Sequence, residues 1–253
     1  MPIDALLVEA LAIGGVLGLL LGLTGAGGSL VGLPLLLSLH LPLRDAIGVS
    51  LGAVALSALI GAIPRWRAGQ VKLAPVFLLA STGLPGSWLG QQIGQYIPEF
   101  WLILAFCLLV LWSAWRMWRN ASLSEQRSVP ELKPAALVVI GLLVGVLSGL
   151  MGVGGGFLIV PALLWFSPLS MLAAAATSMA VIAIVSGAGF FIYLSSAEPS
   201  TTLLAGLACG GMLGVLLGNK LAERLGGVIL QRIFSIMLLL ASLSMALQKL
   251  ILV

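Results

Sequence analysis

The sequence predicts an all-α polytopic membrane protein with two pseudo-symmetric repeats, each beginning with a helix that glycines break. Of its 253 residues, 60% are apolar and only 8% are charged, whereas an ordinary soluble domain carries about 25% charged residues. This composition excludes a soluble enzyme, a nucleic-acid-binding domain and a disordered chain. Apolar runs of membrane-spanning length and an internal repeat then define the architecture.

A membrane-spanning helix needs about 20 apolar residues, and runs of this kind predict eight to ten membrane segments. The longest polar stretch, 119–133, separates the two halves and predicts a cytoplasmic linker between a first repeat, 1–118, and a second repeat, 134–253. Each half has the same order of one long, one short and three long segments. The expected segments are 5–22, 29–40, 45–63, 73–94 and 99–118 in the first half, and 135–151, 156–166, 170–196, 202–219 and 228–250 in the second.

The two halves also share sequence. Residues 22–37 read GLTGAGGSLVGLPLLL and residues 149–164 read GLMGVGGGFLIVPALL, with eight of 16 positions identical at an offset of 127. Glycine and proline determine backbone geometry, so their matched placement indicates a duplication. At an offset of 128, three later glycines also match, and we expect these to serve close helix packing. They are Gly83, Gly86 and Gly90, with the partners Gly211, Gly214 and Gly218.

The membrane topology follows from length and charge. Segment 5–40 would be about 54 Å long as one helix, but the hydrocarbon core is about 30 Å thick. If its short second part returns to the starting side, the two repeats are inverted; if it crosses, they are parallel. With the 65–72 loop in the cytoplasm, the inverted model places ten Lys/Arg inside and two outside, against eight and four for the parallel model. The positive-inside rule therefore favours inverted repeats.

The glycine-rich breaks at 25–29 and 152–156 predict a binding site. Unwound backbone within a membrane is tolerated only where it is buried or lines a polar cavity. A short helix follows each break, and its free N–H groups form an anion site without any charged side chain. Two such helix ends meeting near the midplane predict a site for a small oxyanion, although glycines also serve simple close packing. The predicted substrate-binding residues are Gly25, Gly27, Gly28, Ser29, Ser50, Gly152, Gly154, Gly155, Gly156, Thr177 and Ser178.

Several further polar positions leave alternatives open. The hydroxyls of Ser50, Thr177 and Ser178 either donate to an anion or bond the carbonyl four residues back in their own helix. Asn219 aligns with Gln91 near a span end, where helix capping is the favoured role.

The prolines, cysteines and tryptophans have expected structural roles. We expect Pro34 and Pro161 to kink or end the short helices, and Cys107 and Cys209 to be small buried hydrophobes. Six tryptophans near span ends are expected to be interfacial anchors. Those tryptophans are Trp66, Trp101, Trp112, Trp115, Trp118 and Trp165.

Other classes of site are not indicated. No Asp, Glu, Lys or Arg falls at the centre of an expected span, so a buried-carboxylate proton relay is unsupported. No Cys/His cluster, Ser-His-acid set or Walker sequence is present, so we expect no metal, no catalytic residues, no cofactor and no ATP use. The expected partners are a small anion and the lipid bilayer, not nucleic acid.

The paired motifs GLTGAGGSLVGLP and GLMGVGGGFLIVP resemble the TauE/SafE sulfite exporter family, also called TSUP, over nearly the whole chain. Residues 46–50 and 174–178 resemble the Ala-x-x-Thr-Ser pattern of that family, except that Val49 stands where threonine is common. The resemblance implies a multi-pass inner-membrane transporter, and the known substrates of the family are sulfite, sulfoacetate and other organosulfonates. We expect this chain to export a small anion of that kind. The alternatives are an anion channel or a carrier of a different small anion. An integral-membrane enzyme or assembly factor is the third hypothesis, and the lack of polar catalytic groups argues against the enzyme.

Overall fold

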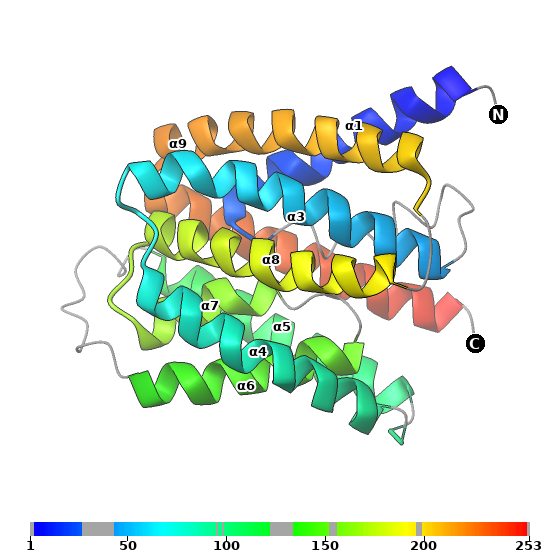
Figure 1. Cartoon of the computed structure of the whole chain (residues 1–253). Helices are drawn as coiled ribbons and strands as arrows, with labels where there is room; N and C mark the ends of the chain where they lie inside the picture. The colour runs from blue at the N-terminus through cyan, green and yellow to red at the C-terminus, as the bar shows by residue number, and fades with distance from the viewer. Residues whose placement is uncertain are drawn as a thin grey trace.

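In the computed structural model, the eight helices formed by the described residues lie side by side with their axes roughly aligned (Figure 1). The structure describes residues 3–26, 43–94, 96–97, 99–121, 134–151, 156–195 and 199–251, and no β-strand occurs within these ranges. The helices are α1 (Ile3–Thr24), α3 (Leu43–Arg67), α4 (Leu73–Gly94), α5 (Glu99–Asn120), α6 (Pro134–Met151), α7 (Gly156–Phe166), α8 (Met171–Leu194) and α9 (Thr201–Ile251).

The helix boundaries agree closely with the expected segments. The 73–94 and 156–166 segments coincide with α4 and α7, while the expected short segment 29–40 lies outside the described residues. The segments 202–219 and 228–250 form the two parts of α9, which meet at Gly226 with φ 77° and ψ 166°. This left-handed φ favours glycine, and it lets the chain reverse direction at one end of the bundle (Figure 1).

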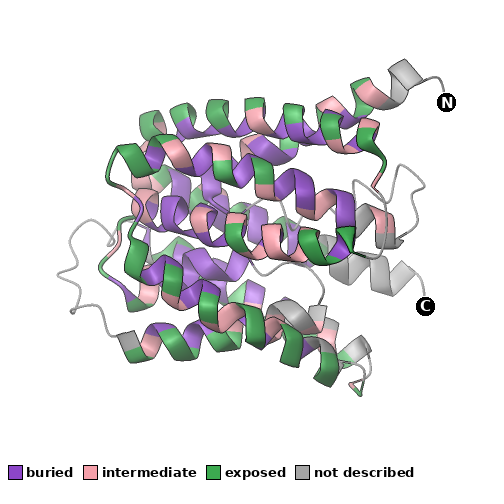
Figure 2. Cartoon of the chain, viewed as in Figure 1, coloured by how far each residue is buried: buried purple, intermediate pink, exposed green. Residues whose placement is uncertain are grey.

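Five of the described helices are long and apolar enough to cross a membrane, namely α1, α3, α4, α8 and α9. The apolar stretch of α9, Thr201–Leu243, has 43 residues, about twice the length that one crossing needs. Exposed positions lie along the outward faces of the helices (Figure 2). Many of the exposed side chains are large and apolar, among them Phe77, Phe191 and Leu213. Such a surface requires lipid rather than water around it, so the chain is a multi-pass membrane protein.

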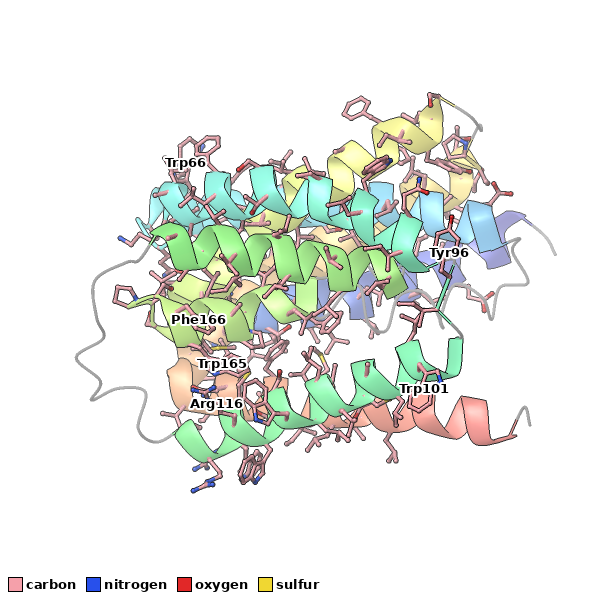
Figure 3. The ribbon with its side chains drawn as sticks, turned by 90° about the horizontal axis from the view of Figure 1, so that it is seen from below. Trp66, Tyr96, Trp101, Arg116, Trp165 and Phe166 are labelled. Atoms are coloured by element: carbon pink, nitrogen blue, oxygen red, sulfur yellow. The ribbon has the colours of Figure 1, made fainter. Side chains whose placement is uncertain are left out.

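Aromatic side chains lie near the helix ends, as interfacial anchors would. Trp66 and Trp101 are exposed at opposite ends of the bundle (Figure 3). Arg116 lies over the rings of Trp112 and Trp165, at 5.2 and 4.8 Å from the ring centroids (Figure 3). Because a guanidinium and an indole both suit the polar edge of a membrane, these contacts agree with the anchoring role.

The glycines expected to serve packing do so, which confirms that prediction. A Cβ on Gly86 would lie 2.7 Å from the Leu142 carbonyl oxygen of α6, and a Cβ on Gly218 would lie 2.5 Å from the Leu19 carbonyl oxygen of α1. Helices in a membrane associate through such close backbone contacts. Consequently α1 packs along α9 and α4 packs along α6, so each pair joins one helix from each half of the chain.

The directions of corresponding helices can be compared between the two halves of the chain. In Figure 1, α1, α3 and the first part of α9 start at the end of the bundle where the N-terminus lies, whereas α4, α6 and α8 start at the opposite end. In the internal alignment α1 corresponds to α6, α3 to α8, and α4 to the first part of α9. Corresponding helices thus point in opposite directions, which supports inverted repeats. The inverted topology and the division into repeats at 119–133 stay predictions.

Side-specific cysteine labelling tests the inverted relation. In a background where Cys107 and Cys209 are alanine, we expect Ala68→Cys and Arg224→Cys to be labelled by a membrane-impermeant maleimide only after cells are opened. Tyr96→Cys should be labelled in intact cells, because Tyr96 lies at the other end of the bundle (Figure 3). Labelling of positions 68 and 224 from opposite sides would support parallel repeats instead.

Candidate substrate site

The first break begins where α1 ends inside the bundle. The Gly25 N–H donates to the Leu21 carbonyl at 2.7 Å, and Gly25 itself has φ +74°. A Cβ there would lie 2.5 Å from the Cα of Ala175, so α1 stops directly against the backbone of α8. Thr24 is fully buried, and its hydroxyl donates to the Leu20 carbonyl at 2.7 Å. The remaining predicted residues of this break, Gly27, Gly28 and Ser29, lie outside the described residues.

The second break leads into a short buried helix. Gly152, Gly154 and Gly155 lie outside the described residues, and Gly156 is the buried first residue of α7. With 11 residues, α7 is about 16 Å long, about half the thickness of the hydrocarbon core. Its residues 156–163 are all buried. Pro161 lies inside α7 and does not end it, and Pro34 lies outside the described residues.

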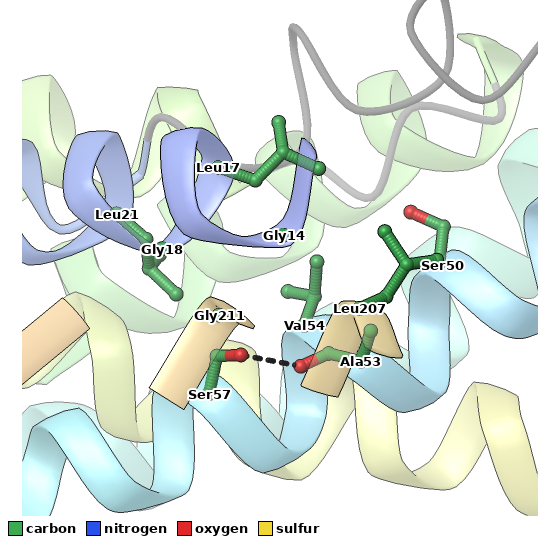
Figure 4. Close-up of a pocket in the computed structure, with 10 residues that line it drawn as sticks. All are labelled: Gly14, Leu17, Gly18, Leu21, Ser50, Ala53, Val54, Ser57, Leu207 and Gly211. Atoms are coloured by element: carbon green, nitrogen blue, oxygen red, sulfur yellow. Dashed lines mark hydrogen bonds between the residues drawn. The ribbon is translucent and has the colours of Figure 1, made fainter. Parts of the chain in front are cut away.

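The hydroxyl groups predicted to bind substrate lie in two different places in the bundle. Thr177 is buried, and its Oγ1 accepts a hydrogen bond from the Lys72 N–H at 3.2 Å. Ser178 is also fully buried, and within the described residues its Oγ has no hydrogen-bond partner. Ser50 is half-buried and lines a cavity between α1, α3 and α9 (Figure 4). Because a buried hydroxyl normally has a partner, Ser178 has unused hydrogen-bonding capacity.

Two cavities, each lined by helices from both halves of the chain, occupy equivalent places in the bundle. The first lies between α1, α3 and α9, and Ser57 in its wall bonds the Ala53 carbonyl at 2.7 Å (Figure 4). The second lies between α4, α6, α7 and α8. At offsets of 127 and 128, most of their lining positions correspond. Gly14, Leu17, Gly18, Ala53, Val54, Ser57, Leu207 and Gly211 of the first cavity match Gly141, Val144, Gly145, Val181, Ile182, Val185, Leu79 and Gly83 of the second.

Arg65 is a residue of this region that sequence reasoning misplaced. The expectation that it lies in a cytoplasmic loop is wrong, because α3 extends to Arg67 and Arg65 is only 1% exposed. Its Nη2 donates to the Gly22 carbonyl at 2.6 Å, near the end of α1. Helical spacing could have indicated that Arg65 is buried. Arg65 continues the buried positions Val54, Ala58 and Gly61 at intervals of three and four residues, and residues at these intervals share one face of a helix.

Two more residues differ from their expected roles. Asn219 does not cap a helix: it lies inside α9, and its Nδ2 donates to the Gly61 carbonyl of α3 at 2.8 Å. The end of α1 packs against the same turn, since a Cβ on Gly22 would lie 3.0 Å from the Asn219 backbone nitrogen. Cys107 is buried as expected, but Cys209 is exposed, because its position on α9 faces outward.

Apolar spans, interrupted helices and a buried polar cluster near the end of α1 are features typical of membrane transporters. The family model described as "Sulfite exporter TauE/SafE" matches residues 10–245, and the chain belongs to this family. The protein is therefore a membrane transporter and not an enzyme.

Curated relatives carry transporter names. The chain is 31% identical over 250 residues, 94% of each chain, to a "Probable membrane transporter protein" of Xylella fastidiosa (strain Temecula1 / ATCC 700964). It is 29% identical over 220 residues, 85% of this chain and 90% of the relative, to the "Probable membrane transporter protein YdhB" of Bacillus subtilis (strain 168). No solved structure matches the chain.

Proposed function

We propose that the protein is a secondary transporter of the bacterial inner membrane that exports a small sulfur-containing oxyanion, such as sulfite, sulfoacetate or another organosulfonate. The observation that carries the proposal is the end of α1 at Gly25, deep in the bundle and against α8. A broken helix at such a place leaves backbone groups free for a ligand. Membership of a family named for sulfite export supports the choice of substrate.

Backbone N–H groups at the two breaks hold the oxygens of the anion in this proposal, because the positive end of a helix dipole favours negative charge. Hydroxyls from α3 and α8 complete the site. An inside-negative membrane potential drives a univalent anion outward by about 2.3 kcal/mol per 100 mV, so export needs no coupling ion. The proposed ligands are Gly25, Gly27, Gly28, Ser29 and Ser50 from the first half, and Gly152, Gly154, Gly155, Gly156, Thr177 and Ser178 from the second.

The two equivalent cavities support transport by alternating access. Each contains glycines of an interrupted helix at the contact with its partner helix, Gly14 and Gly18 in one and Gly141 and Gly145 in the other. If the repeats are inverted, equivalent cavities face opposite sides of the membrane. Rocking of one half against the other then exposes the anion to each side in turn.

Ligand-dependent thermal stabilisation of the purified protein tests the substrate class. A ligand that binds only the folded state stabilises it by about 2.7 kcal/mol at a concentration of 100 Kd. We expect sulfite or sulfoacetate to raise the Tm, and chloride, at the same ionic strength, to leave it unchanged. Taurine, sulfate and thiosulfate complete the series. Stabilisation by chloride alone, or by none of the sulfur compounds, would contradict the proposal.

Counterflow separates a carrier from an anion channel. Proteoliposomes loaded with unlabelled sulfite should transiently accumulate ³⁵S-sulfite above its external concentration, because a carrier exchanges one bound anion for another. Uptake that does not saturate and shows no counterflow would support the channel.

A further inference from the structure

We propose that Arg65 is a substrate-binding residue, whose guanidinium holds two oxygens of the transported anion at the end of α1. The proposal rests on the transport function above, and it adds a charged ligand to a site that was expected to consist of backbone N–H groups and hydroxyls. Three observations carry it: the burial of Arg65, its unused donors, and an unpartnered hydroxyl on the neighbouring helix α8.

The hydrogen bonds of Arg65 account for only part of its donors. A guanidinium has five N–H groups, of which Nε carries one and Nη1 two. The Nη2 atom donates to the Gly22 carbonyl at 2.6 Å. Within the described residues neither Nε nor Nη1 has a hydrogen-bond partner, although the side chain is 1% exposed. Because a buried charge without partners is unfavourable, this arrangement is complete only when an acceptor is added.

A further unpartnered donor comes from α8, which packs against the same end of α1. Gly22 and Gly25 lie one turn apart, and Gly25 touches Ala175 of α8. Ser178, one turn further along α8, has a fully buried Oγ without a partner in the described part of the chain. Ala175 and Ser178 share a helix face because residues three apart are neighbours. Ser178 therefore brings a second free donor to the break that Arg65 contacts.

The position of the charge explains why an arginine is needed there. The carboxyl end of α1 carries the negative end of the helix dipole and free carbonyls, both of which repel an anion. Arg65 binds one of these carbonyls and adds a full positive charge. Glu223 on α9 is the acidic group whose charge acts on Arg65, but Glu223 is exposed, and within the described residues it forms no hydrogen bond with Nε or Nη1 of Arg65. The net effect at the break is attraction for a single anion.

The chemistry of a guanidinium selects the ligand class. Its planar fork binds two oxygens of one anion at once, a geometry that carboxylate, phosphate and other oxyanions match and chloride does not. Sulfite and sulfonates each present three oxygens, so two can bind Arg65 while the third accepts from Ser178. An oxyanion is therefore preferred over a halide at this site.

The second half lacks this charge. The position equivalent to Arg65 at an offset of 128 is Tyr193, whose hydroxyl donates to the Asp45 carboxylate at 2.9 Å. The proposal consequently assigns one charged ligand to the site, and it comes from the first half of the chain.

Affinity measurements on four variants test the assignment. Sulfite, sulfoacetate, phosphate, acetate and chloride are titrated against each purified protein, and the apparent Kd is obtained from ligand-dependent thermal stabilisation. We expect Arg65→Gln to raise the Kd for sulfite about 100-fold, because a buried partner of the anion is removed. Arg65→Lys keeps the charge but loses the fork, and Ser178→Ala loses one hydrogen bond; each should raise the Kd about 10-fold. The matched control is Arg67→Gln, on the same turn but exposed, which should change the Kd less than about twofold.

The possible outcomes distinguish a failure of the Arg65 assignment from a failure of the proposed function. If Arg65→Gln lowers the Tm of the free protein but leaves the Kd for sulfite unchanged, Arg65 only stabilises the end of α1. That result overturns the inference, and the proposed function stands. If Arg65→Gln does not fold, wild-type affinity in both Arg65→Lys and Ser178→Ala overturns it. If the wild type binds phosphate or acetate but no sulfur oxyanion, the proposed substrate is wrong, and loss of that binding in Arg65→Gln supports the inference. Binding of none of these anions to the wild type overturns both.

Discussion

Replacement of Gly214 by leucine is expected to abolish the folded protein or to destabilise it by about 3 kcal/mol or more. A Cβ at this position would overlap the Gly15 carbonyl oxygen of α1, and it would lie 2.8 Å from the Leu19 backbone nitrogen. Backbone atoms cannot rotate away as a side chain can, so α1 and α9 must separate. Helices in lipid depend on close packing for their association, and the change therefore removes the contact that joins α1 to the bundle.

The measurement is the yield of monodisperse protein after extraction in detergent, together with its Tm. Gly187→Leu is the matched control, because a Cβ on Gly187 meets nothing within 4 Å. Gly86→Leu should be as damaging as Gly214→Leu, since Gly86 occupies the equivalent place between α4 and α6. A monodisperse Gly214→Leu protein with the Tm of the wild type would show that these helices do not pack as described.

Replacement of Gly25 by alanine is expected to reduce transport of sulfite by at least about tenfold and to destabilise the fold by about 3 kcal/mol. Two costs combine. Gly25 has a φ of +74°, which is strained for any residue with a Cβ and costs about 1–2 kcal/mol. In addition, the new Cβ would lie 2.5 Å from both the Cα and the carbonyl oxygen of Ala175, so α1 must move away from α8. Both the proposed site and the packing around it change.

Gly69→Ala separates the strain from the displacement. Gly69 has φ +71° but open space around it, so its replacement should cost only the strain of about 1–2 kcal/mol and leave transport unchanged. The Tm and the initial rate of ³⁵S-sulfite uptake into proteoliposomes are measured for both variants. Equal behaviour of Gly25→Ala and Gly69→Ala would show that contact between Gly25 and Ala175 has no role in transport.

Sequence reasoning was most successful where composition changes sharply along the chain. The bounds of α4 and α7 match the expected segments because polar or glycine-rich residues interrupt long apolar runs there. It was least successful at the end of α3, where a change in composition does not end the helix. At the end of α3, polar residues mark the membrane edge, but the helix continues through Trp66 and Arg67 and turns Arg65 inward.

The candidate site was predictable only in its outline. Matched glycines located the two breaks, and Gly25 does have the left-handed φ that such a break requires. The chain alone gives no sign that Arg65 contacts Gly22 or that Asn219 contacts Gly61, because 43 residues separate the first pair and 158 the second. Contacts of this kind depend on how helices pack, and local periodicity does not encode them.

By itself, the sequence determined the membrane class, the apolar segments, the duplication and the family. All four follow from properties read along the chain: hydropathy over about 20 residues, the spacing of glycines, and similarity to relatives. Only the tertiary structure decided that α1 packs on α9 and α4 on α6, that two cavities occupy equivalent places in the bundle, and that Arg65 is buried with free donors beside the first break. The physical reason is that burial and hydrogen-bond partners are properties of packed neighbours, which come from distant parts of the chain.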